Sequence, residues 1–449
     1  MTQSVPARRG SGLIVAAPAS GSGKTLLTFG LLRLLRERGL RVAAAKAGPD
    51  YIDPSFHAAA SGGACLNLDA WAMRESTVRA SVEMLESQAD IVLCEGVMGL
   101  FDGAGPDGEA GSTAALARLT GWPVVLVVDA RRQGASAAAL VGGFMRHDPA
   151  VPLAGVVFNR VAGTRHRMLL ETALARHLPG LPLLGALMQD PALTLPERHL
   201  GLVPAGEQHC EAAISRAAEA VAAGLDIARL LKLARPAANS RPHPAPGPQL
   251  PPLGRRIAVA RDDAFVFTYP AMLRGWRDAG AEVFFFSPLA DEAPDPTADA
   301  VYLPGGYPEL HAGRIAACER FFGGLRRGAA DSTAIYGECG GYMVLGERLI
   351  AADGRVHRMA GLLPLATSFA ERRLHLGYRE VTLRAAGWLG TAGTRYRGHE
   401  FHYATLVSEG GAEPLFAAND SCGVGLGPAG LCRGTVGGSF IHLIDRADD

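Results

Sequence analysis

The chain has 449 residues, enough for two or three domains, and its 48 % hydrophobic and 20 % charged residues are ordinary for a globular protein. Its 44 basic and 44 acidic side chains balance, which argues against nucleic acid or an anionic membrane as a partner. The seven dispersed cysteines argue against a disulfide framework or a structural zinc site and favour a reducing, cytoplasmic location. No run of about 18 apolar residues occurs, so no membrane-spanning helix is expected.

The first half of the chain alternates short apolar runs with helical patterns. The runs are typical of strands buried on both faces, and the leucine spacing of residues 24–39 predicts a helix. Such alternation predicts an α/β domain with a parallel sheet. The predicted strands are GLIVAAP, RVAAAKAG, DIVLCEG, PVVLVVDA, LAGVVFNRV and LPLLGAL.

A proline-rich stretch divides the chain. Seven prolines between Pro236 and Pro252 favour an extended linker, so we predict a domain over 1–234, a linker over 235–254 and a second α/β domain over 255–449. The tail from about Gly361 is typical of mixed α+β structure. The strands expected in the second domain are RRIAVA, AEVFFFSP, DAVYLPGG and STAIYGEC, and YMVLGERLI is expected to be a helix.

The first chemical motif is APASGSGKT, which follows a predicted strand and opens a predicted helix. This context is the one that a phosphate-binding P-loop requires, although Pro18 stands where the usual pattern has glycine. Lys24 can reach the β- and γ-phosphates of ATP, and the Thr25 hydroxyl can ligate Mg²⁺. The predicted ATP-binding residues of the loop are Ser20, Gly21, Ser22, Gly23, Lys24 and Thr25.

Carboxylates follow the next strands. Glu95 ends the strand DIVLCEG, in the position of a residue that holds Mg²⁺ directly or through water. Asp102 lies in the glycine-rich loop beyond it and could join it. The alternative is that these acids only cap the next helix.

Two further strand ends carry polar side chains. KAGPDYIDP contains Lys46, Asp50, Tyr51 and Asp53, which would face the same crevice as the P-loop at the carboxyl ends of parallel strands. Asp53 is a candidate metal ligand and the others are candidates for positioning substrate. Because Gly-Pro-Asp also favours turns, an ordinary turn is equally compatible with this stretch. Asn159, in VVFNRV, could read the adenine edge or could serve as a cap.

The second chemical motif is YGECGGYM, in which Cys339 separates a predicted strand from a predicted helix. A sharp strand-to-helix turn exposes a nucleophile, and the neighbouring glycines permit a strained backbone and the close approach of a substrate. Backbone N–H groups nearby could form an oxyanion hole. The candidates for it are Gly305 and Gly306, in VYLPGGYPE, and Gly340.

A nucleophilic cysteine also needs a base. His442, in SFIHL, follows a strand-like run, and His399 and His402, in GHEFHY, are its competitors. Since an inert buried thiol is the commonest fate of a free cysteine, the residues alone leave both interpretations of Cys339 open. The other six cysteines lack the glycine-rich turn and are interpreted as structural: Cys65, Cys94, Cys210, Cys318, Cys422 and Cys432.

The ordered set of motifs resembles that of the cobyrinic acid and hydrogenobyrinic acid a,c-diamide synthases, the glutamine-dependent amidases of corrin-ring biosynthesis. The resemblance implies an N-terminal amidoligase domain similar to dethiobiotin synthetase and a C-terminal class I glutamine amidotransferase domain. The matching segments span nearly the whole chain: APASGSGKT, KAGPDYIDP, EGVMGLFDG, LPERHLGLVPA, ARDDAFVFTYP, LPGGYPE, GECGGYM, GHEFHY and SFIHL.

By this likeness, ATP and Mg²⁺ activate the a and c carboxylates of a corrinoid polycarboxylate as acyl phosphates. Cys339 attacks glutamine, His442 raises the nucleophilicity of its thiol, and the released ammonia completes the amides. Asp445 receives no role, because this family type is thought to work with a cysteine–histidine dyad. Arg198 and His199, in LPERHLG, are candidate cations for the anionic substrate.

The sequence leaves other readings of the function open. The rivals are a related tetrapyrrole amidase, of the cobyric acid synthase or sirohydrochlorin type, and a ParA/MinD-like ATPase switch with a non-catalytic second domain. No residue decides whether the ring contains cobalt. A homodimer is compatible with the sequence, and the oligomeric state stays open.

Overall fold

The computed structural model describes residues 9–193, 197–198, 201–202, 208–238 and 247–448. The chain forms two compact units, one of Met1–Trp71 with Glu75–Ala245 and one of Ala72–Arg74 with Pro246–Asp449. Among the described residues, no helix has the length and apolar character needed to cross a membrane.

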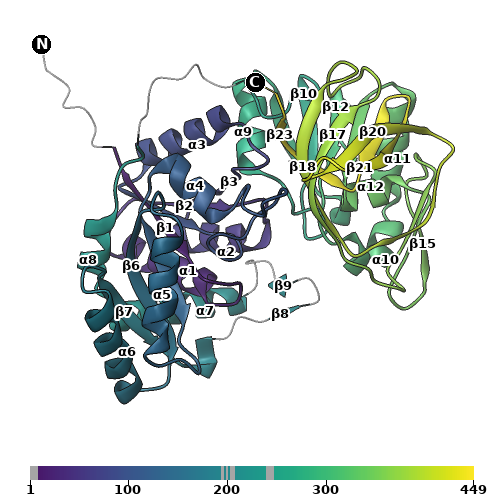
Figure 1. Ribbon diagram of the computed structural model, residues 1–449. Coiled ribbons are helices and arrows are strands. Elements are labelled where there is room, and N and C mark those ends of the chain that lie inside the picture. Colours follow the sequence, from purple (N-terminus) through teal and green to yellow (C-terminus); the bar gives the residue numbers. More distant parts are fainter. Residues whose placement is uncertain (1–8, 194–196, 199–200, 203–207, 239–246, 449) are drawn as a thin grey trace, which may run out of the picture. The chain divides into compact units, whose positions relative to one another are not determined.

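In its described part, the first unit is a seven-stranded parallel sheet with helices on both faces (Figure 1). The strand order is β3-β2-β4-β1-β5-β6-β7. The strands are β1 (Ser11–Ala16), β2 (Val42–Ala47), β3 (Cys65–Leu68), β4 (Ile91–Glu95), β5 (Val124–Asp129), β6 (Leu153–Val161) and β7 (Leu183–Met188), and β8 (Glu197–Arg198) and β9 (Gly201–Leu202) form a separate pair. The helices are α1 (Lys24–Glu37), α2 (Ile52–Ser61), α3 (Glu75–Gln88), α4 (Thr113–Thr120), α5 (Ser136–His147), α6 (Thr164–His177), α7 (Gln208–Gly224) and α8 (Ile227–Leu233).

The central strands β1, β4 and β5 are almost wholly buried, as their continuous apolar runs predict. Helix α1 packs against α2 and α7 over one face, where Leu27, Phe29 and Phe56 join the core. The carboxyl ends of β1, β2 and β4 meet at one edge of the sheet, since these strands are parallel neighbours. That edge carries the P-loop and Glu95.

Strand β3 was not expected from the sequence. It has only four residues, and Asn67 interrupts its apolar character. The structure explains this polar residue, because the buried Asn67 amide donates to the carbonyl oxygens of Gly48 and Asp50 at 2.9 and 2.7 Å. Asn67 thereby anchors the loop that carries the predicted positioning residues.

The second unit begins with the same parallel architecture and ends in antiparallel strands (Figure 1). Its main sheet has the order β11-β10-β12-β13-β22-β21-β20-β17-β18-β23, and a smaller sheet has the order β15-β14-β16-β19. The strands are β10 (Arg256–Ala260), β11 (Glu282–Phe286), β12 (Ala300–Leu303), β13 (Ala334–Glu338), β14 (Arg348–Ile350), β15 (Val356–Arg358), β16 (Leu365–Ser368), β17 (His375–Leu383), β18 (Arg395–His402), β19 (Thr405–Glu409), β20 (Glu413–Asp420), β21 (Gly425–Arg433), β22 (Val436–Ser439) and β23 (Ile441–Arg446). The helices are α9 (Pro270–Asp278), α10 (Ala312–Ala316), α11 (Glu319–Ala330) and α12 (Gly340–Leu345).

The main sheet of this unit curls so that its last strand returns to its middle. Strand β22 pairs with β13 in parallel, and after Phe440 the chain continues as β23, which pairs with β18 at the edge of the sheet. The Leu443 N–H nevertheless donates to Glu338 Oε1, at the end of β13, at 3.0 Å. The curl therefore brings His442 to the turn that carries Cys339.

Two expectations for this unit were wrong. The helix expected over YMVLGERLI ends at Leu345, and Arg348–Ile350 forms strand β14 because Gly346 adopts an extended conformation and β15 and β16 supply pairing partners. The tail expected to be mixed α+β contains, after α12, strands but no helix among the described residues. Its glycine- and threonine-rich segments find antiparallel partners, which local composition does not reveal.

Candidate active sites

The P-loop lies between β1 and α1, as its sequence context predicts. Gly23 precedes the helix with φ 97°, and a Cβ atom placed there would lie 2.1 Å from Asn159 Nδ2, so this position requires glycine. Asn159 donates to the Ser22 carbonyl at 2.9 Å and accepts from the Arg160 N–H. The nitrogen of the Asn159 amide therefore holds the loop and its oxygen binds the backbone of β6, and its suggested role in reading adenine stays a prediction.

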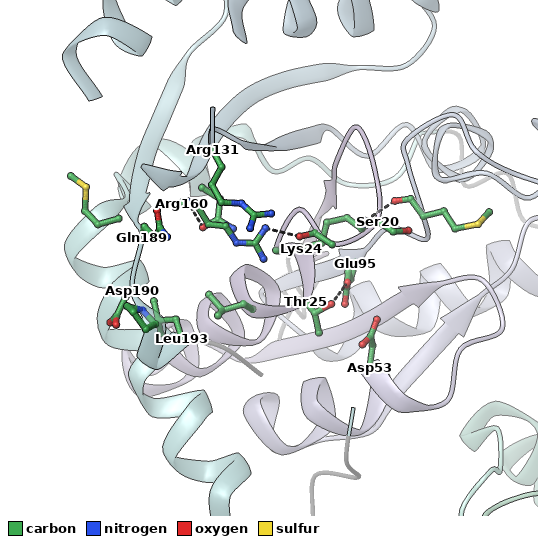
Figure 2. Close-up of a pocket in the computed structure, with 18 of the residues that line it drawn as sticks. Ser20, Lys24, Thr25, Asp53, Glu95, Arg131, Arg160, Gln189, Asp190 and Leu193 are labelled. Atoms are coloured by element: carbon green, nitrogen blue, oxygen red, sulfur yellow. Dashed lines mark hydrogen bonds between the residues drawn. The ribbon is translucent and has the colours of Figure 1, made fainter. Parts of the chain in front are cut away.

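A cavity of about 660 Å³ opens over this loop (Figure 2). It is lined by Ser20, Gly21, Gly23, Lys24 and Thr25, by Asp53 of α2 and by Glu95 at the end of β4. The Lys24 ammonium donates to the Met98 carbonyl at 2.6 Å, and burial lowers the pKa of this lysine. The cavity thus combines a glycine-rich loop, a lysine and carboxylates, as a site for a nucleotide and a divalent cation requires.

Two arginines on the cavity wall were not predicted (Figure 2). Arg160 donates to the Gly21 carbonyl of the P-loop and to Asp129, both at 2.7 Å. Arg131 donates to the same Asp129 carboxylate. Arg160 directly follows Asn159 on β6, and Arg131 lies just beyond β5, so both come from the strand ends that form this edge of the sheet.

Glu95 is the centre of a buried network of charges. Its Oε1 accepts a hydrogen bond from the Thr25 hydroxyl at 2.7 Å and lies 3.2 Å from Lys46 Nζ. Its Oε2 lies 2.5 Å from His57 Nε2. Lys46 Nζ also lies 2.5 Å from Asp53, so one ammonium group faces two carboxylates.

The pKa values of this network are shifted by burial and by the charges of its members. Burial disfavours the Glu95 carboxylate, but Lys46, His57 and Thr25 outweigh it and hold the pKa of Glu95 at about 2. Burial and the neighbouring Glu95 raise the pKa of Asp53 to about 8. Burial alone would lower the pKa of Lys46, but Glu95, Asp53 and Asp50 together raise it. Carboxylate and hydroxyl oxygens at one cavity are ligands that Mg²⁺ prefers, so Thr25, Asp53 and Glu95 are the candidate ligands.

His57 escaped the sequence analysis, although a signal for it existed. Asp53 and His57 stand four residues apart on α2, so their side chains share one face of the helix. His57 is fully buried and packs its ring against Glu95, which fixes the orientation of that carboxylate. A histidine one turn after a predicted metal ligand is thus a positioning group.

The structure gives local roles to other predicted residues of this unit. Asp50 accepts from the backbone N–H groups of Ile52 and Asp53 at the start of α2, which is the turn alternative left open above. Asp102 accepts from the Gly99 N–H at 2.9 Å and so shapes its own loop. Tyr51 precedes α2.

The cations suggested in LPERHLG are not tested by the structure. Of Arg198 only the backbone, in β8, is described, and His199 lies outside the described residues.

In the second unit, Cys339 stands on a strained turn. It directly follows β13 and precedes α12, with φ 49° and ψ −105°, a conformation that a residue with a side chain rarely adopts. Among the described residues, the non-glycine residues with positive φ include Cys339 but no other cysteine. Its N–H donates to the Ser439 carbonyl at 2.8 Å, which ties the turn to β22. This is the geometry of a nucleophile elbow.

Gly305 lies next to both Cys339 and His442. A Cβ atom placed at Gly305 would lie 2.4 Å from His442 Cε1, 3.2 Å from His442 Nε2 and 3.2 Å from Cys339 Cβ. The imidazole edge that carries Cε1 and Nε2 and the Cys339 side chain therefore both border Gly305. Similarly, a Cβ at Gly340 would lie 3.1 Å from the Gly306 nitrogen, so Gly340, directly after Cys339, is a close neighbour of Gly306.

The other histidines and the acid considered for the thiol site make different contacts. His402 Nδ1 lies 3.1 Å from the Ala404 carbonyl and its Nε2 lies 3.0 Å from Glu400, so both of its ring nitrogens are engaged. His399 is the cross-strand neighbour of His442. The Asp445 carboxylate accepts from Arg74, which belongs to the same unit, at 2.8 Å. His442 is thus the histidine that the structure brings to Cys339.

The thiol and the imidazole are both neutral at rest. Burial raises the pKa of Cys339 well above its ordinary value. Burial, with the nearby His399 and His402, lowers the pKa of His442 to about 3. Transfer of the thiol proton to His442 therefore separates charge inside a buried site, which is costly unless other groups compensate.

Comparison with known proteins accounts for both units. A family model described as the CobQ/CobB/MinD/ParA nucleotide binding domain matches residues 13–203, and one described as the CobB/CobQ-like glutamine amidotransferase domain matches residues 256–449. The hydrogenobyrinate a,c-diamide synthase of Rhizobium meliloti is 54 % identical over 443 residues, which cover 98 % of this chain and 100 % of the relative. The protein of the same name from Rhodobacter capsulatus is 54 % identical over 436 residues, covering 96 % of this chain and 98 % of the relative. The chain therefore belongs to the family of the hydrogenobyrinate a,c-diamide synthases.

Proposed function

We propose that the protein uses ATP and glutamine to amidate the a and c carboxylates of hydrogenobyrinate, a step of cobalamin biosynthesis. The proposal is carried by one observation: a single chain joins a P-loop with buried carboxylates to a cysteine–histidine pair on a nucleophile elbow. The near full-length relatives supply the identity of the ring. A glutamine-dependent amide-forming ligase is the enzyme class to which these parts belong.

The first unit activates the acceptor. A ring carboxylate attacks the γ-phosphorus of ATP, which forms an acyl phosphate and releases ADP. Lys24 and the N–H groups of the loop offset the charge of the transferred phosphoryl group. Thr25, Asp53 and Glu95 would hold Mg²⁺, which supplies further charge neutralisation on the phosphates. Lys46 and His57 keep the two carboxylates in place.

The second unit supplies the nitrogen. Cys339 gives its proton to His442 and attacks the glutamine carboxamide, so a carbon–sulfur bond forms. The carbon–nitrogen bond then breaks, ammonia takes the proton from His442, and water later releases glutamate from the thioester. N–H groups of Gly306 and Gly340 would receive the oxyanion. Ammonia attacks the acyl phosphate and displaces phosphate to give the amide.

The state of the cysteines favours the cytoplasmic location that the sequence also predicts. All seven are free thiols, and a nucleophilic Cys339 needs reducing surroundings, so we place the protein in the cytoplasm.

Two substitutions and two nitrogen donors test the proposal. Cys339→Ala should abolish glutamine hydrolysis and glutamine-dependent amidation while leaving ammonia-dependent amidation intact. Lys24→Ala should abolish amidation from either donor. Mass spectrometry of the metal-free and the cobalt-containing ring would report each added amide. Retained glutamine hydrolysis in Cys339→Ala contradicts the nucleophile, and amidation of the cobalt form alone contradicts the proposed ring.

A further inference from the structure

Glu338 is a buried acid that the mechanism above does not use. It is the last residue of β13 and directly precedes Cys339. Its side chain is 1 % exposed, and so is that of His442. A buried carboxylate beside a nucleophile is costly unless its charge is compensated, so its presence there calls for a reason.

The contacts of Glu338 aim its carboxylate at His442. Oε2 accepts from the Tyr302 hydroxyl at 2.7 Å and lies 3.9 Å from His442 Nδ1. Oε1 accepts from the N–H of Leu443, the residue after His442, at 3.0 Å. One carboxylate thus binds the backbone next to the base and lies 3.9 Å from Nδ1 of its ring.

We propose that Glu338 is the acid partner of His442, positioning its ring and stabilising the imidazolium that forms when Cys339 gives up its proton. The proposal rests on the roles of Cys339 and His442 proposed above. No atom is transferred to Glu338: the S–H bond breaks, His442 Nε2 takes the proton, and the carboxylate offsets the new positive charge at its Nδ1 side. The cysteine–histidine dyad is then completed by an acid that precedes the nucleophile in the chain.

The surroundings of His442 explain why such an acid is needed. His399 and His402 on β18 lie near it and oppose its protonation, and Glu400 on the same strand favours protonation but is engaged with Arg379 and His402. Asp445, the acid that follows His442 in sequence, binds Arg74. In the described chain, the hydrogen-bond partners of Glu338 include no arginine or lysine. They are the hydroxyl groups of Tyr302 and Tyr336 and the N–H of Leu443.

The resting ionisation of Glu338 suits this role. Burial raises the pKa of its carboxyl group to about 7, while hydrogen bonds from Tyr302 and Leu443 oppose that rise. Near neutral pH the carboxylate is therefore available, and an imidazolium at 3.9 Å would favour the ionised form further. The rate of glutamine hydrolysis should accordingly rise with pH as Glu338 loses its proton.

Glutamine hydrolysis by the full-length protein, followed from acidic to alkaline pH, tests the proposal. Glu338→Gln keeps the size of the side chain but removes its charge. We expect kcat to fall by about 10²-fold or more with little change in KM for glutamine, and the rise of kcat/KM near neutral pH to disappear. Glu338→Asp should restore part of kcat and of the pH-dependent rise, because it restores the charge. Ammonia-dependent amidation should equal that of the unmodified protein.

Two further variants decide the remaining outcomes. The Asp445→Asn variant should retain the pH-dependent rise. If this variant loses the rise while Glu338→Gln keeps it, the role belongs to Asp445 and the proposal is overturned. If Glu338→Gln does not fold, Tyr302→Phe decides, because loss of its hydrogen bond should move the rise to higher pH; an unmoved rise overturns the proposal. Hydrolysis by Cys339→Ala would instead contradict the proposed nucleophile, so the two failures are distinguishable.

Discussion

Replacing Gly305 by alanine probes the geometry of the thiol site with a single methyl group. The added Cβ would lie 2.4 Å from His442 Cε1, whereas ordinary contacts between such atoms begin at 3.4 Å. The imidazole must therefore move by the difference, 3.4 minus 2.4, or about 1 Å. His442 is almost fully buried, so neither the ring nor its strand can yield into solvent.

A displacement of this size separates the base from the thiol. Because a misplacement of about 1 Å costs about 10²-fold in rate, glutamine hydrolysis should fall by that factor. Relief of the overlap should also lower the free energy of unfolding by about 1–3 kcal/mol, the usual cost of an overpacked core. Amidation driven by ammonia should be unchanged, since it does not need the thiol.

The assay compares glutamate release with ammonia-dependent amide formation in the same preparation. Gly410→Ala is the matched control: it adds the same methyl group in the same unit, where no atom lies within 4 Å and φ is not in the left-handed region. Full glutamine hydrolysis by Gly305→Ala, with the control also active, would refute the placement of His442 beside Cys339.

Three other predictions concern charges and hydroxyls. Thr25→Ala removes the donor to Glu95 and a proposed Mg²⁺ ligand, so amidation from either nitrogen donor should need more Mg²⁺ in an activity titration, with glutamine hydrolysis unchanged. Lys46→Met leaves the carboxylates of Asp53 and Glu95 without their shared cation, so the free energy of unfolding in urea should fall by about 3–5 kcal/mol; a stable variant would contradict the buried ion pairs. Burial raises the pKa of Glu338 from 4.5 to about 7, so the folded state keeps a proton that the unfolded state has lost in this window. The free energy of unfolding should therefore decline as pH rises from 4.5 to about 7, and the decline should exceed that of Glu338→Gln by an amount on the order of 3 kcal/mol. Denaturation in urea at several pH values measures it, and an equal pH dependence of the unfolding free energy in the two proteins would contradict this.

Features that depend on a few neighbouring residues could be predicted from the sequence. The continuous apolar runs of β1, β4 and β5 identified buried parallel strands, because a strand covered on both faces has no polar side. The glycines around Lys24 and Cys339 identified both turns, because Gly21 and Gly23 adopt positive φ and a Cβ atom at Gly337 or Gly341 would overlap its neighbours. Such constraints act within a few residues, so short sequence patterns are enough to recognise them.

Features that depend on distant pairing could not be predicted in the same way. YMVLGERLI has helical composition, but Arg348–Ile350 finds strand partners in β15 and β16. His57 looked like part of an ordinary helix, since only the neighbouring strand β4 places Glu95 against it. Glu338 was overlooked beside Cys339, because its meaning depends on the return of β23 to the end of β13. In each case the deciding neighbour belongs to another element of the chain, so the local residues do not reveal it.

Burial has opposite effects on charge in the two sites. In the first unit, burial brings charges together: Lys46 contacts Asp53 and Glu95 at once, beside the loop that would bind phosphate. In the second unit, burial keeps the Cys339 thiol neutral at rest, which protects it from wasteful reaction but raises the cost of forming a thiolate. A carboxylate held against the base lowers that cost only at the moment when the proton moves. By the proposal above, Glu338 therefore makes a buried, unreactive thiol compatible with catalysis.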